Sequence, residues 1–205
     1  RLSAPLAFGT DHLAPVLYDF MARHPALNID LLLDDRSVDL VGEGVDLGLR
    51  VSVTMVDSGL ISRVLRPVTR VIVGSPAYLD AHGRPDRPEA LTAHPCLLYR
   101  NVPVADQWRF STPDGFRQFR GPERLRADNG TVMLGAAIAG LGLAELPDFI
   151  VSKALADGRL ELLLADHSLQ TSALRLVYPP AGRLSAKVRA LADFLTERFA
   201  APAAL

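Results

Sequence analysis

Arg50 is the charged residue whose position most clearly suggests a chemical role, because it interrupts the otherwise apolar run 45–53. A guanidinium at the end of a strand can form paired hydrogen bonds to a carboxylate, which makes Arg50 a candidate for binding an anionic ligand. The same side chain could instead form a structural ion pair, with Asp46 or with an acid near a hinge. Both interpretations remain open at this point.

A second candidate for anion binding is the segment Asn129-Gly130-Thr131, which precedes the helical stretch 131–139. The first backbone N–H groups of a helix have no partner within the helix, and they attract anions. Asn129 could simply cap the helix, or it could both cap the helix and contact a ligand.

Patterns that would indicate an enzyme are missing from the sequence. Asp11, Asp34 and Asp35 are best interpreted as loop charges and helix caps, and no nucleophile elbow, Cys–His signature or phosphate-binding loop is present. The glycines in Gly140-Leu141-Gly142 lie between a helix and a strand, which is the reverse of the order in a dinucleotide site. The histidines have no metal-binding spacing: His12, His24, His82, His94 and His167. We therefore expect no catalytic residue, no metal and no cofactor.

The composition indicates a globular chain that does not bind DNA by itself. Of 205 residues, 49% are apolar, and 22 basic against 23 acidic residues give a net charge of −1, whereas nucleic-acid binders usually have a basic excess. The single cysteine, Cys96, precludes an internal disulfide and is interpreted as a small core residue rather than a reactive thiol. With no signal peptide and no apolar run long enough to span a bilayer, we expect a cytoplasmic protein without a membrane partner.

The first part of the chain alternates strands and helices, a pattern that predicts a parallel sheet with right-handed crossovers. A turn at 8–11 is expected to cap a helix that carries Leu13, Val16, Leu17, Phe20 and Met21 on one face. The other expected elements are a short helix at 37–41 and strands at 1–5, 27–33 and 46–51.

A second αβ series follows and leaves one strand and one helix at the end. We expect strands at 60–65, 68–73, 96–99, 125–127, 141–146, 160–164 and 174–178, a hairpin of 108–110 with 116–120, and a last helix from Ser185. If the last pair returns to the first sheet, 68–73 and 174–178 cross between two lobes. Lobe I is then 1–74 plus 173–205, and lobe II is 75–172. A small ligand would bind between them, at the carboxyl ends of the strands.

Several stretches, in this order and spacing, resemble the effector-binding (substrate-binding) domain of LysR-type transcriptional regulators over essentially the whole chain. The most specific runs from Val38-Asp39-Leu40-Val41 through Gly44-Val45-Asp46 to Leu47-Gly48-Leu49-Arg50. The others are Leu2-Ser3-Ala4-Pro5 with Phe8-Gly9 and His12-Leu13-Ala14-Pro15, Phe20 with His24-Pro25 and Ile29-Asp30-Leu31, Ser75-Pro76-Ala77-Tyr78-Leu79, His94-Pro95-Cys96-Leu97, and 136–144 with Leu146-Pro147. The sequence departs from the family at Glu145, where an apolar residue is usual, and in the loop 51–58, which is about one residue longer.

The resemblance implies an α/β protein with two Rossmann-like αβ lobes joined by two crossover strands, a periplasmic-binding-protein-like (type 2) fold. It also implies a winged helix-turn-helix at the N-terminus of the full-length regulator, which is absent from this chain and would carry all DNA binding. A homodimer is implied as well, with a tetramer possible in the full-length protein. In the homodimer, the helix with Leu13 and Phe20 is expected to pack against helix 131–139 of the second chain.

The expected site gathers strand ends and helix starts of both lobes around a small, anionic effector. The residues expected to contact it are Pro5, Leu6, Phe8, Arg50 and Ser52 in lobe I and Tyr99, Asn129, Gly130 and Thr131 in lobe II. Phe8 and Tyr99 would form apolar walls, while Arg50 and Thr131 would hold a polar or carboxylate group. The alternatives are a solute-binding protein of a transporter and an enzyme on a similar fold.

Overall fold

The computed structural model describes residues 1–36, 38–53, 59–103, 105, 107–167, 169–180 and 185–200. The chain divides into two compact units, unit 1 with Arg1–Val68 and Ser172–Leu205, and unit 2 with Thr69–Thr171. The first division therefore falls after Val68, whereas the sequence suggested Gly74. The physical reason is that β5 (Arg70–Gly74) is hydrogen-bonded to two strands of unit 2.

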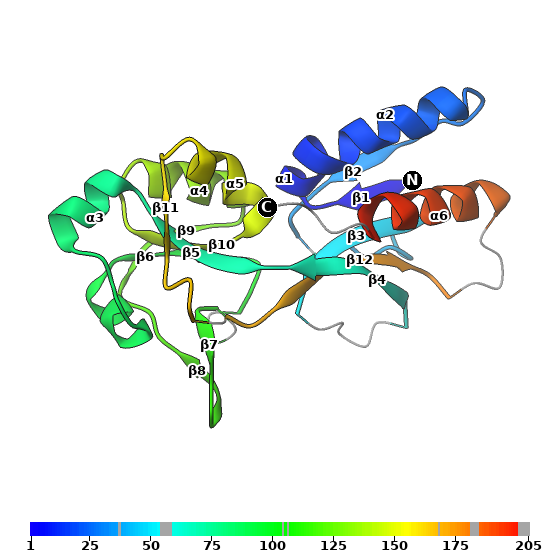
Figure 1. Ribbon diagram of the computed structural model, residues 1–205. Helices are drawn as coiled ribbons and strands as arrows, with labels where there is room; N and C mark the ends of the chain where they lie inside the picture. The colour runs from blue at the N-terminus through cyan, green and yellow to red at the C-terminus, as the bar shows by residue number, and fades with distance from the viewer. Residues whose placement is uncertain are drawn as a thin grey trace. The chain divides into compact units, whose positions relative to one another are not determined.

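Unit 1 is built on a mixed five-stranded sheet (Figure 1). Its strands, in spatial order, are β2 (Leu31–Leu33), β1 (Leu2–Ala4), β3 (Leu47–Ser52), β12 (Ser172–Tyr178) and β4 (Ile61–Val68). β1 is parallel to β2 and β3, as the alternating elements predicted. The strand that returns at the end of the chain, β12, lies antiparallel between β3 and β4, so the complete sheet is mixed, and the sequence had given no direction for these two strands.

The helices of unit 1 are α1 (Leu6–Phe8) and α2 (Ala14–Arg23) near the start of the chain and α6 (Ala186–Ala200) at its end. Figure 1 shows α2 and α6 on the same side of the sheet. Ring contacts join both early helices to α6: the centroids of Phe20 on α2 and Phe194 are 5.2 Å apart, and those of Phe8 on α1 and Phe199 are 5.3 Å apart. Leu13, Leu17 and Phe20 of the predicted apolar stripe are buried, whereas Met21, which was expected on the same face, is 39% exposed, so the stripe is narrower than the helical spacing predicted.

The expected turn at 8–11 is replaced by a π-helical turn, Gly9–Leu13, that joins α1 to α2. The helix thus begins directly after Pro5, and Asp11 lies inside it rather than capping it. The N–H of Ala14 donates to the carbonyl of Gly9, five residues back. Widening the helix at this point accommodates Pro15, which has no N–H to donate and would crowd the preceding turn of a regular α-helix.

Unit 2 contains a second five-stranded sheet, with the order β11 (Glu161–Leu163), β5, β10 (Leu143–Pro147), β6 (Cys96–Tyr99) and β9 (Glu123–Ala127). Its helices are α3 (Pro76–His82), a 3-10 helix at Pro88–Ala93, α4 (Gly130–Ile138) and α5 (Asp148–Ala156). The hairpin predicted around Asp114-Gly115 is confirmed, with β7 (Arg109–Thr112) antiparallel to β8 (Gly115–Gln118).

The sheet of unit 2 separates two apolar cores, because alternate residues of each strand face opposite sides. On one side Ile72, Cys96 and Leu143 pack with Trp108 and other residues. On the other side, neighbouring residues of the same strands pack against buried side chains of α4 and α5. The predicted core position of Cys96 is thus confirmed, since the residue is wholly buried.

Some element boundaries differ from the sequence-based expectation. The strand expected at 27–33 is limited to Leu31–Leu33, and β4 runs through Pro67 to Val68, with the break at Thr69. Residues 40–44 form turns rather than a helix, and Ser37 lies outside the described residues, as does 54–58 of the longer loop. In the part of the chain that the structure describes, no helix has the length and apolarity that crossing a membrane requires.

Candidate functional site

The guanidinium of Arg50 lies on β3 with part of its hydrogen-bonding capacity unused. Its Nη1 donates to the hydroxyl of Ser3 (3.1 Å) and to the carbonyl of Leu49 (2.8 Å), while its Nη2 is buried without a partner. Burial lowers the pKa of Arg50, and the negative charges of Asp34 and Glu43 partly oppose that shift. Among the described residues no carboxylate, Asp46 included, lies within ion-pair distance of Arg50, so the ion pair with Asp46 that the sequence left open is not formed.

The residues at the start of α1 that were expected to contact a ligand have partners within the protein instead. Pro5 occupies the N-cap position, and the N–H of Leu6 donates to Oδ1 of Asp35 at 2.8 Å. A carboxylate of the protein itself therefore already uses this donor. Phe8 is wholly buried and packs on Phe199, so its side chain belongs to the core and does not form a wall open to a ligand.

In unit 2 the structure brings the expected residues together. β6 and β9 are parallel, Tyr99 at the end of β6 is in register with Ala127, and Asn129 follows two residues later. Oδ1 of Asn129 accepts from the N–H groups of Thr131 (2.9 Å) and Val132 (3.1 Å), so Asn129 is a helix cap. Gly130 is buried under Ile150, whereas Thr131 is exposed.

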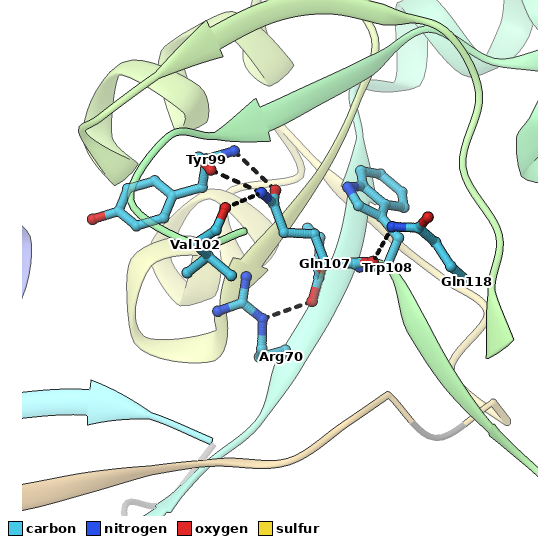
Figure 2. A network of polar contacts seen from close by, with 7 residues as sticks. Arg70, Tyr99, Val102, Gln107, Trp108 and Gln118 are labelled. Carbon is cyan, nitrogen blue, oxygen red and sulfur yellow. Dashed lines mark hydrogen bonds and ion pairs between the residues drawn. The ribbon is translucent and has the colours of Figure 1, made fainter. Parts of the chain in front are cut away.

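Gln107 fixes the backbone at the end of β6 (Figure 2). Its amide oxygen accepts from the N–H of Tyr99 (3.0 Å), and its Nε2 donates to the carbonyls of Tyr99 and Val102 (2.8 Å each). Its own carbonyl accepts from Nε2 of Gln118 on the hairpin (2.9 Å). A buried amide with this many hydrogen bonds holds Tyr99 in place.

The partners of Glu145 account for a charged residue at a position where the family usually has an apolar one. It lies in the core of unit 2, 4% exposed, where Oε1 accepts from Nε of Arg70 (2.6 Å) and Oε2 accepts from the N–H of Trp108 (2.5 Å). Gln107, which directly precedes Trp108 in the chain, is hydrogen-bonded to Tyr99. The carboxylate of Glu145 therefore supports the segment that positions Tyr99.

Two residues near Arg50 were not found from the sequence, Ser3 and Arg175. Ser3 is the one polar residue of β1 and accepts the hydrogen bond from Arg50. Arg175 is directly opposite Arg50 on β12. The signal that identified Arg50, a charge inside an apolar strand, is present again in Leu174-Arg175-Leu176.

The described residues contain no cluster of three or more metal-binding side chains. The thiol of Cys96 is buried and accepts a hydrogen bond from the N–H of Gly121 (3.2 Å). Burial raises the pKa of this thiol to about 11, which disfavours the reactive thiolate.

Two αβ units, each built on a mixed five-stranded sheet, are the architecture of the two-lobed α/β class of proteins. The family model of the LysR substrate binding domain matches residues 1–200, and this chain therefore belongs to that family. The fold class and the family predicted from the sequence are confirmed.

Known relatives are transcriptional regulators. The chain is 37% identical over 187 residues to an uncharacterized HTH-type transcriptional regulator of Haemophilus influenzae, covering 91% of this chain and 65% of that protein. It is 32% identical to the probable HTH-type transcriptional regulator LtrA of Klebsiella pneumoniae, covering 96% of this chain and 64% of that protein. The chain thus spans somewhat less than two thirds of the length of these relatives.

A solved structure supports the same assignment. The regulatory domain of CrgA, a LysR-type regulator from Neisseria meningitidis, superposes with a TM-score of 0.83 at 26% identity, covering 97% of both chains. The comparisons favour a regulatory domain over the solute-binding protein and the enzyme that the sequence had left as alternatives.

Proposed function

We propose that this domain senses a small anionic effector for a regulator whose DNA-binding helix-turn-helix lies in another part of the full-length protein. The observation that carries the proposal is Arg50, a guanidinium with a buried and unused N–H group in a domain of the LysR family. Guanidinium groups bind carboxylates with charge-assisted, often paired hydrogen bonds. We infer a cytoplasmic protein, because the effector and the DNA must both be accessible to it.

The proposed contacts come from both units. In unit 1 they are Pro5, Leu6, Arg50 and Ser52, and in unit 2 they are Tyr99, Asn129, Gly130 and Thr131. Phe8 is left out because its side chain is buried. Asp35 already accepts the hydrogen bond from the N–H of Leu6, so side chains rather than the N-terminus of α1 would bind the negative charge of the effector. An effector can shift the regulator only by its difference in affinity for the two functional states.

We further propose a homodimer in which α2 packs against α4 of a second chain. Leu17 and Phe20 of α2 are buried within unit 1, so a partner would contact the exposed side of the helix, which carries Tyr18 and Met21. On α4, Val132 and Gly135 are exposed. Small side chains on α4 would allow close approach of two helices. A tetramer in the full-length protein, with DNA bound only by its helix-turn-helix segment, completes the proposed assembly.

A thermal-shift screen of organic acids against this chain tests the proposed function, followed by operator binding of the full-length protein with the best acid. A ligand well above its dissociation constant stabilises the folded domain by about 2–4 kcal/mol. We expect at least one acid to raise the unfolding temperature and to change the operator affinity. If acids that bind the domain leave the operator affinity unchanged, the proposed function is wrong.

A further inference from the structure

Four buried side-chain atoms of unit 1 have no hydrogen-bond partner: Nη2 of Arg50, Nε of Arg175, and the hydroxyl oxygens of Ser52 and Ser62. Buried polar groups in folded proteins are nearly always paired, and an unpaired one is costly. Such atoms on one sheet need a physical explanation.

The four side chains share one face of the sheet. Arg50 is directly opposite Arg175 in the antiparallel pair of β3 and β12, and directly opposite residues point to the same side. Ser52 is two residues beyond Arg50, and two residues along a strand return to the same face. Ser62 of β4 is opposite Val177, which is two residues beyond Arg175.

An independent contact supports this arrangement. Gly48 is two residues before Arg50 and opposite Val177, and a Cβ built on Gly48 would lie 3.0 Å from Cγ2 of Val177 and 3.2 Å from Oγ of Ser3. Ser3, the acceptor of Arg50, thus lies on the same side. The other face carries Leu47, Leu49, Leu174 and Leu176, all of which are buried.

The negative charges of Asp34 and Glu43 act on Arg50 only from beyond ion-pair distance, so neither of them pairs directly with an arginine of this face. Two guanidinium groups that are directly opposite in a sheet repel one another. Within the described part of the chain, Arg175 has a single hydrogen bond, from Nη2 to the carbonyl of Val53 at 3.4 Å, and neither arginine forms an ion pair. Val64, opposite Arg175 on β4, is 53% exposed, so solvent reaches this face beside Arg175.

We propose that Arg50, Arg175 and Ser52 bind a compact oxyanion with two negative charges, which can be an inorganic sulfate or phosphate or a short dicarboxylate. The unused guanidinium N–H groups and the hydroxyl group of Ser52 would all donate to its oxygens, and the charge of the anion would offset both arginines. Ser62 lies too far from Ser52 for one such ion to contact both, because their partners on β12, Val177 and Ala173, are four residues apart. This inference rests on the proposed function in that it specifies the ligand chemistry of Arg50, and it adds Arg175 to the recognition.

Calorimetric titration of this chain with sulfate, phosphate and succinate, at constant ionic strength with chloride, tests the inference. At least one of these dianions should bind with one-to-one stoichiometry and a dissociation constant below about 1 mM, whereas acetate should bind far more weakly. Preference for the two inorganic ions or for succinate identifies the source of the oxyanion.

Arg175→Met should weaken the binding about tenfold or more, since a charge-assisted contact is lost. Arg175→Lys should weaken it less, because it keeps the charge but not the guanidinium. Arg63→Met is the matched control: Arg63 is on β4, opposite Leu176, and its side chain is 52% exposed, so binding should be unchanged. Thermal unfolding without ligand should show no loss of stability in Arg175→Met, since an unpaired charge is removed.

The inference is overturned if none of the three dianions binds, or if Arg175→Met binds them as the wild type does. An organic effector that needs Arg50 but tolerates Arg175→Met would keep the proposed function and overturn this inference. Dianion binding that is lost in both arginine variants, with no effect on operator binding by the full-length protein, would support this inference and contradict the proposed function.

Discussion

Glu145 illustrates how a single residue can depart from a family pattern without disrupting the core. Its carboxylate binds the guanidinium of Arg70 and the backbone N–H of Trp108. Trp108 has a φ of 57°, a left-handed conformation that is unfavourable for a side chain of this size. The carboxylate thus both neutralises a nearly buried arginine and holds a strained backbone.

Replacing one member of this pair should be far more damaging than replacing both. Glu145→Leu leaves Arg70 as an unpaired cation and should lower the free energy of unfolding by about 3–5 kcal/mol. The double variant Glu145→Leu with Arg70→Met should recover much of that loss. Urea denaturation measures all three proteins, and a Glu145→Leu domain as stable as the wild type would show that the pair is dispensable.

Cys96 should behave as a core residue rather than a redox sensor. Its pKa of about 11 implies that roughly one thiol in a thousand is ionised at pH 8. Ellman's reagent should therefore react with the native chain much more slowly than with the chain in urea. Equal rates in the two conditions would contradict the buried position.

The same pKa predicts a stability change in alkali. The folded value is raised from the unfolded value of 9.0 to about 11, so the unfolded state loses its thiol proton first. The stability that the buried neutral thiol contributes is complete below about pH 9 and is lost as the pH rises toward 11. Cys96→Ala should make the denaturation midpoint less dependent on pH within this window.

At the residue scale, the sequence predicted those site residues that stand out from their immediate neighbours in the chain. Arg50 was found because it interrupts an apolar strand, and Arg175 could have been found in the same way. The pairing of Asp35 with the N–H of Leu6 joins residues that are distant along the chain, so no local pattern predicts it. Phe8 was misassigned because an aromatic residue after a strand is compatible with both a core and a ligand wall.

At the scale of elements, helices with a clear apolar stripe were predicted well and strand limits less well. α3 starts at Pro76 after the N-cap Ser75, whose hydroxyl accepts from the N–H of Tyr78, and Ser-Pro at the start of a helix is a local signal of this kind. The position of Gly142 between a helix and a strand is confirmed, and glycine is required there because its φ is 150° and a Cβ would lie 2.4 Å from the carbonyl oxygen of Pro95. The π-helical turn before Pro15 was not predicted, because Gly9-Thr10-Asp11 is also typical of a capped turn.

The proposed dimer can be tested on α4 at Gly135, where a Cβ would contact nothing within 4 Å. Gly135→Ala should stabilise the helix by about 0.5–1 kcal/mol, since glycine is a poor helix residue. Gly135→Trp should fold equally well as a monomer but separate the two helices of a dimer. Sedimentation velocity should therefore show a dimer for the wild type and a monomer for Gly135→Trp, and a Gly135→Trp dimer of wild-type stability would refute this interface.

At the scale of the whole molecule, the alternation of strands and helices was sufficient to predict two αβ units. The combination of parallel and antiparallel strands in both sheets was harder to predict, because strand direction depends on contacts between segments that are far apart in the sequence. The limit of unit 1 at Val68 follows from the pairing of β5 with β10 and β11, which the apolar run 68–73 does not reveal.

Charge at the level of the whole chain predicts its behaviour toward DNA. With a net charge of −1, this chain alone should not bind duplex DNA measurably at physiological salt. Fluorescence anisotropy of a labelled operator measures this, with the full-length regulator as the positive control. Salt-dependent binding by the chain alone would mean that a basic surface of this domain takes part in DNA recognition.

The central claim, that Arg50 recognises an anionic effector, is tested most directly by calorimetry of the wild-type chain and Arg50→Ala with the acid found in the thermal screen. Loss of a charge-assisted hydrogen bond costs about 1.5–3 kcal/mol, so the dissociation constant should rise about tenfold or more in a variant that remains folded. An unchanged dissociation constant would show that Arg50 has only a structural role and would contradict the assignment of the site.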